Sequence, residues 1–295
     1  MTRRRKAIQL MAAGAAAMFS ADAIAQHINE NGAILNKQLG GNIRHSVSRW
    51  CYSNFSLEEL CIAAKRLGIE SVELLNVEEL PVVKRHDLTC GMVSAIRGGF
   101  GITRGWNKIE NHEGLIKLYA DLLIPETAKA GMTNLICFSG NREGMSDEQG
   151  LKNCAIGLQK IIPLAEKHKV TLVMELLNSK VDHKDYMCDR TAWGVELCKM
   201  VGSENFKLLY DIYHMQIMEG DIIRTIRENY MYFAHYHTGG VPGRNEIDHT
   251  QELNYPAIMR AIVETGYKGL VGQEFIPKNP DKLLSLEQAI KICTV

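Results

Sequence analysis

The sequence has no excess of charge of either sign, because its 34 lysines and arginines equal its 34 aspartates and glutamates. No long block of like charge occurs outside the extreme N-terminus. The chain therefore lacks the basic surface by which proteins bind nucleic acid. We expect a small-molecule partner and no nucleic acid. The oligomeric state stays open, with a homo-oligomer as one option.

The cysteines also lack any recognised spacing, with neither a C-x-x-C pair nor a zinc-finger pattern. Several fall inside apolar strand or helix patterns, where a buried thiol behaves as a small hydrophobic side chain. We expect mostly free, structural cysteines. They are Cys51, Cys61, Cys90, Cys137, Cys154, Cys188, Cys198 and Cys293.

The first 26 residues differ in kind from the rest. Residues 2–6 (TRRRK) form a basic cluster, an apolar and small run follows from Ala7 to Phe19, and residues 23–25 have the A-x-A form of a signal peptidase site. The paired arginines resemble a twin-arginine export signal. An apolar run of about a dozen residues is too short to span a bilayer comfortably. We expect residues 1–26 to be a signal peptide, the mature protein to be periplasmic or exported, and no stable membrane insertion after signal removal.

From residue 42 onward, short β-rich runs alternate with longer helical patterns, which indicates repeated βα units and a parallel sheet. Eight candidate strands are Ile43–Val47, Ser71–Leu75, Cys90–Ile96, Asn134–Phe138, Thr171–Glu175, Lys207–Asp211, Tyr232–His237 and Gly269–Glu274. Eight such units in about 250 residues predict an α/β fold, a single-domain (β/α)8 TIM barrel over residues 42–295. No glycine-rich phosphate fingerprint follows the first strand, which argues against an open dinucleotide-binding sheet.

Helix-capping patterns separate these strands. Residues 56–59 (SLEE) have the form of a capping box that opens a helix to Leu67, and Gly68 ends it. Further helices are expected at about Glu113–Ala130, Asp147–His168, Thr191–Val201, Asp221–Asn229, Tyr255–Glu264 and Pro280–Cys293. Pro81 interrupts the pattern over Val77–Lys84, so we expect that connection to be short or irregular.

Four metal-competent side chains end four successive predicted strands, at the end of the barrel where TIM-barrel active sites lie. These are Glu175, Asp211, His237 and Glu274, which we call the strand-end cluster. Three carboxylates and an imidazole suit one divalent ion, Mg²⁺ or Mn²⁺, with Co²⁺ also compatible. Such an ion would polarise a substrate carbonyl and stabilise an enediolate. Glu175 and Glu274 are then the candidate catalytic acid and base.

The loops above the barrel supply candidate substrate-binding residues. His214 lies three residues after Asp211, where it could donate to a substrate oxygen. Arg244 could bind a carboxylate or hydroxyl groups bidentately. Glu252 could orient His214 or Arg244. The alternatives are an ordinary surface histidine, a solvated arginine and a solvated carboxylate.

Three further side chains have less specific positions. His235 shares its strand parity with His237, so we expect it to point inward one layer deeper, as a hydrogen-bonded core histidine. Trp50 and Trp106 follow the first and third predicted strands and could line the pocket. Buried loop aromatics without a functional role are equally common.

Several linked segments carry a family resemblance. Residues 175–178 (ELLN), 211–216 (DIYHMQ), 235–237 (HYH), 241–244 (VPGR) and 252–255 (ELNY) resemble hydroxypyruvate isomerases of the xylose-isomerase-like TIM barrel superfamily. The resemblance covers about residues 42–295. It implies a metal held by the strand-end cluster, with its two glutamates as acid and base. His237 departs from it, since glutamine is usual there in bacterial hydroxypyruvate isomerases and histidine is typical of the superfamily's ketose 3-epimerases.

These patterns leave three functions open. The leading hypothesis is a metal-dependent isomerase that moves a proton between adjacent carbons of a small hydroxy-carbonyl compound such as hydroxypyruvate. A ketose 3-epimerase would instead return the proton to the same carbon from the opposite face. A non-catalytic exported sugar-binding barrel is the third, and the intact pair of glutamates argues against it. A nuclease is disfavoured, since the superfamily's multi-zinc nuclease site needs more histidines at strand ends.

Overall fold

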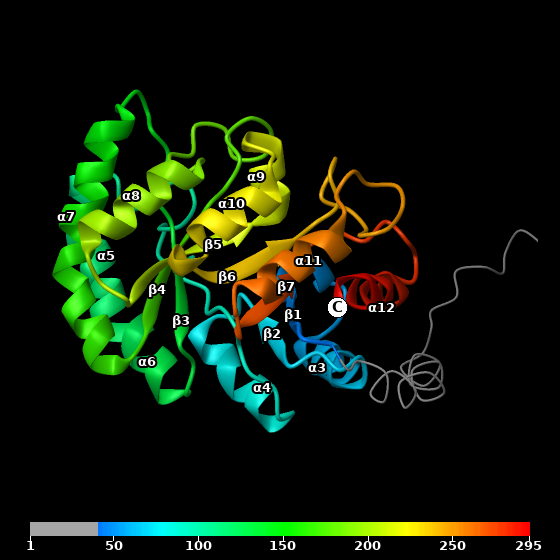
Figure 1. Ribbon diagram of the computed structural model, residues 1–295. Helices are drawn as coiled ribbons and strands as arrows, with labels where there is room; N and C mark the ends of the chain where they lie inside the picture. Colours follow the sequence, from blue (N-terminus) through cyan, green and yellow to red (C-terminus); the bar gives the residue numbers. More distant parts are fainter. Residues whose placement is uncertain (1–40) are drawn as a thin grey trace, which may run out of the picture.

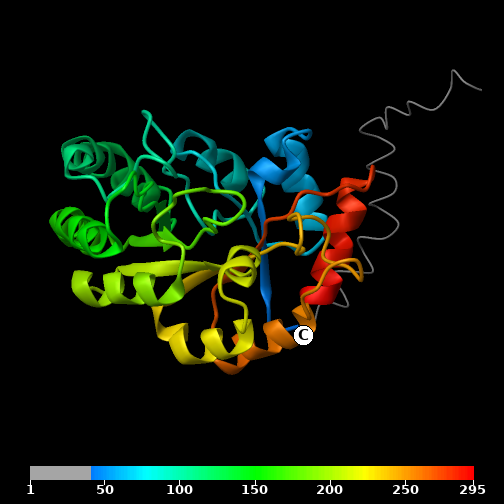
Figure 2. The same ribbon diagram turned by 90° about the horizontal axis from the view of Figure 1, so that it is seen from above.

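The computed structural model describes residues 41–295, in which parallel strands lie in the middle and helices pack around them (Figures 1 and 2). Seven strands form one sheet in the order β2-β1-β7-β6-β5-β4-β3. Their bounds are β1 Arg44–Ser48, β2 Ser71–Glu73, β3 Asn134–Cys137, β4 Thr171–Glu175, β5 Phe206–Asp211, β6 Phe233–Thr238 and β7 Leu270–Gln273. These strands match seven of the eight predicted ones, which confirms the α/β architecture.

The eighth predicted strand, Cys90–Ile96, is not a regular strand. Its segment lies between β2 and β3 and forms only isolated parallel bridges, including one between Leu75 and Val93 and one between Val93 and Leu135. The carbonyl of Thr89 accepts from the amide of Val72, and the next hydrogen bond joins the amide of Leu74 to the carbonyl of Met92. Three residues thus oppose two, as in a β-bulge, and the ladder is interrupted.

Helices cover the outside of the sheet. They are α3 Leu57–Arg66, α4 Leu80–Arg85, α5 His112–Leu118, α6 Ile124–Lys129, α7 Asp147–His168, α8 Thr191–Val201, α9 Ile212–Met218, α10 Ile222–Asn229, α11 Tyr255–Glu264 and α12 Lys282–Cys293. The predicted capping box at Ser56 is present. Pro81 stands in the first turn of α4, which has only six residues and follows a 3-10 turn at Val77–Glu79, so this connection is short and irregular as expected. A π-helical turn at Tyr119–Leu123 interrupts the helix expected over Glu113–Ala130, just before Pro125, which has no amide hydrogen to donate.

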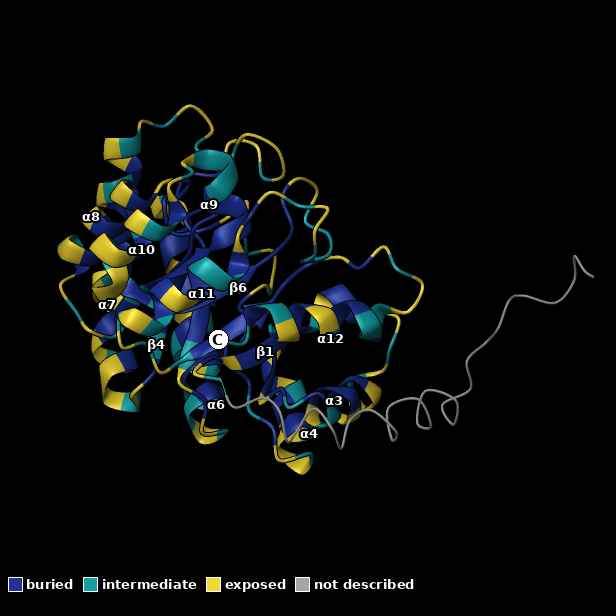
Figure 3. Ribbon diagram, turned by 45° about the vertical axis from the view of Figure 1, so that its right-hand side comes forward, coloured by how far each residue is buried: buried dark blue, intermediate teal, exposed yellow. Residues whose placement is uncertain are grey.

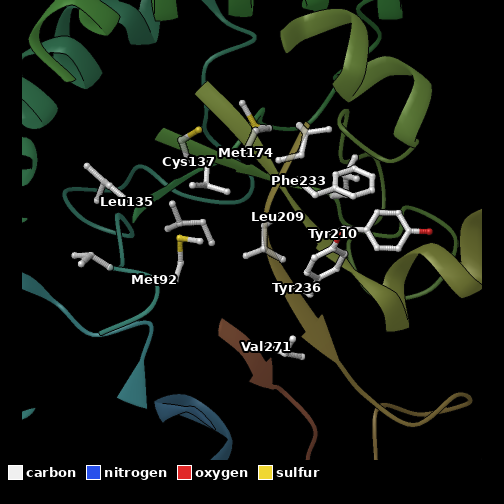
Figure 4. Packing of buried hydrophobic residues seen from close by; sticks show 14 of the residues in the cluster. Met92, Leu135, Cys137, Met174, Leu209, Tyr210, Phe233, Tyr236 and Val271 are labelled. Carbon is white, nitrogen blue, oxygen red and sulfur yellow. The ribbon is translucent and has the colours of Figure 1, made fainter. Parts of the chain in front are cut away.

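The core fills the space between the strands and the helices. Strands are buried along their length, and helices expose only their outer side (Figure 3). On the helix side of the sheet, Tyr210, Phe233 and Tyr236 pack together (Figure 4), with ring centroids of Tyr210 and Phe233 4.7 Å apart. All eight cysteines are free and buried, which confirms the prediction. Burial raises the pKa of Cys90 to about 12, so this thiol is not nucleophilic at neutral pH.

The predicted signal peptide, residues 1–26, lies outside the described residues. Among residues 41–295, no helix is both long enough and apolar enough to cross a membrane.

Candidate metal centre

The structure brings the strand-end cluster together at the C-terminal ends of the strands. Glu175 ends β4 and Asp211 ends β5, while His237 lies in β6 and Glu274 directly follows β7. Asp211 pairs with His237 in the ladder between β5 and β6. One ligand atom from each of the four buried residues lies within 4.8 Å of the others. Parallel register therefore gathers side chains that are up to 99 positions apart in the sequence.

Carboxylates crowd this centre. Burial, with a smaller contribution from the neighbouring Glu274 charge, raises the pKa of Glu175. Burial likewise raises the pKa of Asp211 to about 7. Burial alone would raise the pKa of Glu274 too, but Arg244 and His237 hold it well below its usual range. A cation is the group that would relieve this repulsion.

The donor atoms fit a divalent ion. His237 Nδ1 lies 2.7 Å from Glu274 Oε2 and 3.5 Å from Glu175 Oε1. This buried nitrogen nevertheless makes no aligned hydrogen bond within the described residues. Burial would lower the pKa of His237, but Glu274, Glu175 and Glu73 hold it well above its usual range. A divalent ion bound by these carboxylates would take the place of the ring proton on Nδ1. The four residues would hold such an ion.

Arg244 extends over the cluster from the loop after β6. Its guanidinium lies 3.0 Å from Asp211 Oδ2 and 2.5 Å from Glu274 Oε2. It also lies over the rings of Trp50 and Tyr213, at 5.2 and 5.3 Å from their centroids. Its backbone φ of 57° is uncommon for a residue other than glycine. Arg244 therefore lies at the strand-end cluster, where its charge partly offsets the carboxylates, and its substrate-binding role stays a prediction.

Hydrogen bonds fix the ring of His214. Asn178 Oδ1 accepts from the amides of Val181 and Asp182, so the Asn178 amide nitrogen faces His214 Nδ1 at 2.6 Å. His214 Nδ1 must then be the acceptor, and its Nε2 carries the proton. That Nε2 lies 3.6 Å from Asp211 Oδ2 and has no aligned partner among the described residues.

A cavity of about 290 Å³ opens beside the cluster. Its apolar lining residues are Trp50, Leu74, Ile96, Ile102, Ile136, Phe138 and Leu177. Its polar lining residues are Ser94, Glu175, His183, Arg244 and Glu274. Both candidate catalytic glutamates therefore face the same cavity. Trp50 has a second role, because its indole N–H donates to Glu274 Oε1 at 2.6 Å.

Several predicted positions need correction. Trp106 does not line this cavity, because it is fully buried and packs edge-on against Tyr119 with ring centroids 5.4 Å apart. Glu252 is exposed and accepts from Gln216, so it orients neither His214 nor Arg244. His214 is buried against Asp211 rather than placed on the cavity wall. A substrate-binding role for Glu252 or His214 stays a prediction.

Sequence reasoning missed Glu73, a carboxylate at the end of β2 with no exposed surface. Its Oε1 accepts from His237 Nε2 at 2.8 Å. Its Oε2 lies 3.0 Å from His235 Nε2. His235 thus lies in the barrel interior as predicted, although neither of its ring nitrogens makes an aligned hydrogen bond in the described part of the chain. A glutamate between two apolar residues of a predicted buried strand was the available signal.

Comparison with known proteins places the chain in a family. Residues 61–292 match the family described as "Xylose isomerase-like TIM barrel". The 2-oxo-tetronate isomerase of Cupriavidus necator is 37% identical over 109 residues, which are 37% of this chain and 41% of that protein. The hydroxypyruvate isomerase of Escherichia coli is 30% identical over 149 residues, 50% of this chain and 57% of that protein. The chain spans less than two thirds of the length of either relative.

Solved structures agree on the fold. The AP endonuclease, family 2, from Brucella melitensis superimposes with a TM-score of 0.73 at 24% identity, covering 84% of this chain and 97% of that one. The D-psicose 3-epimerase from Clostridium cellulolyticum does so with a TM-score of 0.64 at 18% identity, covering 85% and 90%. At these identities the likeness shows the fold alone. With the family match over residues 61–292, it establishes that the chain belongs to the xylose isomerase-like TIM barrel family.

Proposed function

We propose that the chain is a metal-dependent isomerase that moves a proton next to the carbonyl of a small hydroxy-carbonyl compound, as in the hydroxypyruvate isomerases. The observation that carries this proposal is that Glu175 and Glu274 line one cavity while sharing the donor cluster with Asp211 and His237. The likeness to a 2-oxo-tetronate isomerase and a hydroxypyruvate isomerase supports it.

A bound ion and the side chains would supply different parts of the chemistry. A divalent ion, Mg²⁺ or Mn²⁺ by its donor set, would polarise the carbonyl and stabilise the negative charge that develops beside it. Glu175 and Glu274 come from β4 and from the end of β7, so one can remove a carbon-bound proton while the other returns one. Trp50 and Arg244 each hold one oxygen of Glu274, which limits the rotation of that carboxylate.

An epimerase on a neutral keto sugar is the second candidate, and the charge of the site favours it. The buried carboxylates are Glu73, Glu175, Asp211 and Glu274. Arg244 and a divalent ion together would supply three positive charges against these four negative ones, which disfavours an anionic substrate. The apolar residues that line the same cavity as the glutamates offer a surface for the carbon skeleton of a sugar.

The two candidates differ in product. Incubation with Mn²⁺ in deuterated water, followed by NMR, tests hydroxypyruvate and a set of ketohexoses side by side. Isomerisation gives the aldehyde–ketone isomer with deuterium on the neighbouring carbon, whereas epimerisation gives the inverted ketose with deuterium on the same carbon. Solvent exchange into neither class would refute both.

Matched variants connect any turnover to the two glutamates. Glu175→Gln and Glu274→Gln should each remove it, because glutamine cannot carry the proton. Glu204→Gln is the control, since Glu204 is a surface residue with a side chain 93% exposed. Full activity in either active-site variant would refute the catalytic role of that glutamate, and a wild type that binds sugars but turns none of them over would favour a non-catalytic sugar-binding barrel. We also propose, from residues 2–25 alone, that the mature protein is periplasmic or exported.

A further inference from the structure

Glu73 lies beneath the strand-end cluster, on the opposite edge of the His237 ring. Its Oε1 accepts an aligned hydrogen bond from His237 Nε2 at 2.8 Å. The other ring nitrogen, Nδ1, faces Glu175 and Glu274. A neutral imidazole has one nitrogen with a proton and one with a lone pair. The Glu73 carboxylate can only accept, so Nε2 carries a proton whatever the charge of the ring, and Nδ1 is the nitrogen that remains to bind an ion in the cluster.

The barrel makes room for this carboxylate at two places. Gly272 in β7 pairs with His237 in β6, and a Cβ at Gly272 would overlap Glu73 Oε1. In the irregular segment between β2 and β3, a Cβ at Gly91 would lie 2.9 Å from Glu73 Oε2. Neither glycine has a positive φ. Space for Glu73, rather than an unusual backbone conformation, therefore accounts for the missing side chain at both positions.

Burying this carboxylate is costly unless partners offset the cost, and its partners here are His237 at 2.8 Å and His235 at 3.0 Å. Glu73 has no exposed surface, and its Oε2 makes no aligned hydrogen bond within the described residues. An apolar side chain of similar volume would avoid the cost of burying a charge. A carboxylate that holds a metal-binding histidine in one tautomer and orientation has a functional reason to be there.

We propose that Glu73 is a positioning residue: it fixes His237 as the Nε2–H tautomer, with Nδ1 presented to the divalent ion of the proposed centre. The inference rests on the proposed function, because it needs a divalent ion in the strand-end cluster. It assigns no contact between Glu73 and the substrate.

The cluster of Glu73, His235 and His237 has an alternative role, because its ligand atoms also lie within 4.8 Å of one another. A second ion there would bind His237 Nε2. Filling both clusters at once would require His237 to give up its remaining ring proton and bridge two ions. Glu73 as an acceptor for Nε2–H therefore predicts one ion per chain.

The first experiment measures tautomer and metal affinity in the full chain. Long-range ¹H–¹⁵N spectra of the metal-free protein, with the His237 signals assigned by His237→Gln, should show a protonated Nε2 in the wild type, whatever the charge of the ring. In Glu73→Leu, Nε2 loses its acceptor while Nδ1 still faces Glu274, so the spectra should show the proton on Nδ1. Titration with Mn²⁺ should give one ion per chain, with affinity about 10- to 100-fold weaker in Glu73→Leu. Glu73→Gln can still accept from Nε2–H through its amide oxygen, so it should restore part of the affinity and most of the tautomer preference.

A second variant guards against a folding defect. Gly91→Ala should displace Glu73 and weaken Mn²⁺ binding without contacting any ligand, because its Cβ would lie 2.9 Å from Glu73 Oε2, whereas a Cβ at Gly272 would also lie 2.8 Å from the ring of His237. Gly194→Ala is its matched control, because the nearest atoms to that Cβ belong to the apolar side chains of Leu208 and Leu176, at 2.9 and 3.3 Å, and not to the cluster. Thermal unfolding of each metal-free variant shows whether it is folded.

The outcomes separate the positioning role from the proposed function. Unchanged tautomer and unchanged Mn²⁺ affinity in folded Glu73→Leu would overturn the inference. So would two ions per chain in the wild type with loss of one in His235→Ala. A wild type that binds no Mn²⁺ would refute the proposed metal centre. The tautomer spectrum would then still decide whether Glu73 orients His237.

Discussion

Acidification should destabilise the protein through His45, which lies in β1, away from the strand-end cluster. His45 is 3% exposed, and its Nε2 lies 3.0 Å from Thr294 Oγ1. The Thr294 hydroxyl donates to Ile290 O, so it accepts from His45, and this sets the neutral Nε2–H tautomer. Burial lowers the pKa of His45 from 6.5 to about 4, against a smaller opposing effect of Glu70.

The sign and size follow from proton linkage. Between pH 6.5 and pH 4 the unfolded chain binds a proton at this position and the folded chain does not, so stability falls as the pH falls. With these two pKa values, lowering the pH from 7.5 to 5 costs about 2 kcal/mol of unfolding free energy at this residue. The contribution is fully present above pH 6.5.

Urea unfolding of the wild type and His45→Gln at both pH values isolates this residue. Glutamine stays neutral and can still donate to Thr294, so the loss on acidification should be about 2 kcal/mol smaller in the variant. All other titrating groups cancel in the comparison. An equal loss in the two proteins would refute the conclusion that His45 is buried as a neutral ring.

Three other outcomes follow from the site and the core. Trp50→Phe keeps an aromatic ring but removes the N–H that donates to Glu274. Turnover in steady-state assays should therefore fall about tenfold, which corresponds to roughly 1.4 kcal/mol of activation free energy, while the free energy of unfolding changes little. Asn178→Ala removes the donor to His214 Nδ1, so the proton should redistribute between the two ring nitrogens, visible in ¹⁵N spectra as loss of a single tautomer. Thiol titration of the native protein should detect none of the eight buried cysteines rapidly and all eight after denaturation, and fast reaction of a native thiol would contradict their burial.

The sequence was sufficient for the parts of the fold that follow local rules. The helix Thr191–Val201 has the predicted bounds, and Gly202 ends it in a left-handed conformation. Glu175 and Asp211 were placed correctly because they end apolar runs, and parallel strands bring such ends to one edge. The bulge in the segment after β2 was not predictable, since it depends on how that segment meets β2 and β3 in space.

Tertiary contacts explain the errors at the site. Glu252 follows a loop pattern that places it near Arg244 in sequence, but its carboxylate turns to Gln216 at the surface. Trp106 follows a predicted strand, yet its ring is buried and packs against Tyr119 instead of facing the cavity. Sequence proximity to a strand end locates a residue's backbone, but it does not determine which side chain reaches the cavity.

Glu73 shows what determines the interior of the barrel. Its strand, β2, is separated from β7 by β1 in the sheet order, yet its carboxylate reaches His237 in β6 because Gly272 in β7 leaves the space between them. The contact therefore needs three properties at once: an inward-facing acid in β2, a missing side chain in β7 and a histidine in β6. Each is unremarkable alone in the sequence. Glu73 and His237 are 164 positions apart in the sequence, so only the folded barrel brings them together. Their contact gives the metal-competent side chains a centre in which the histidine has one defined orientation.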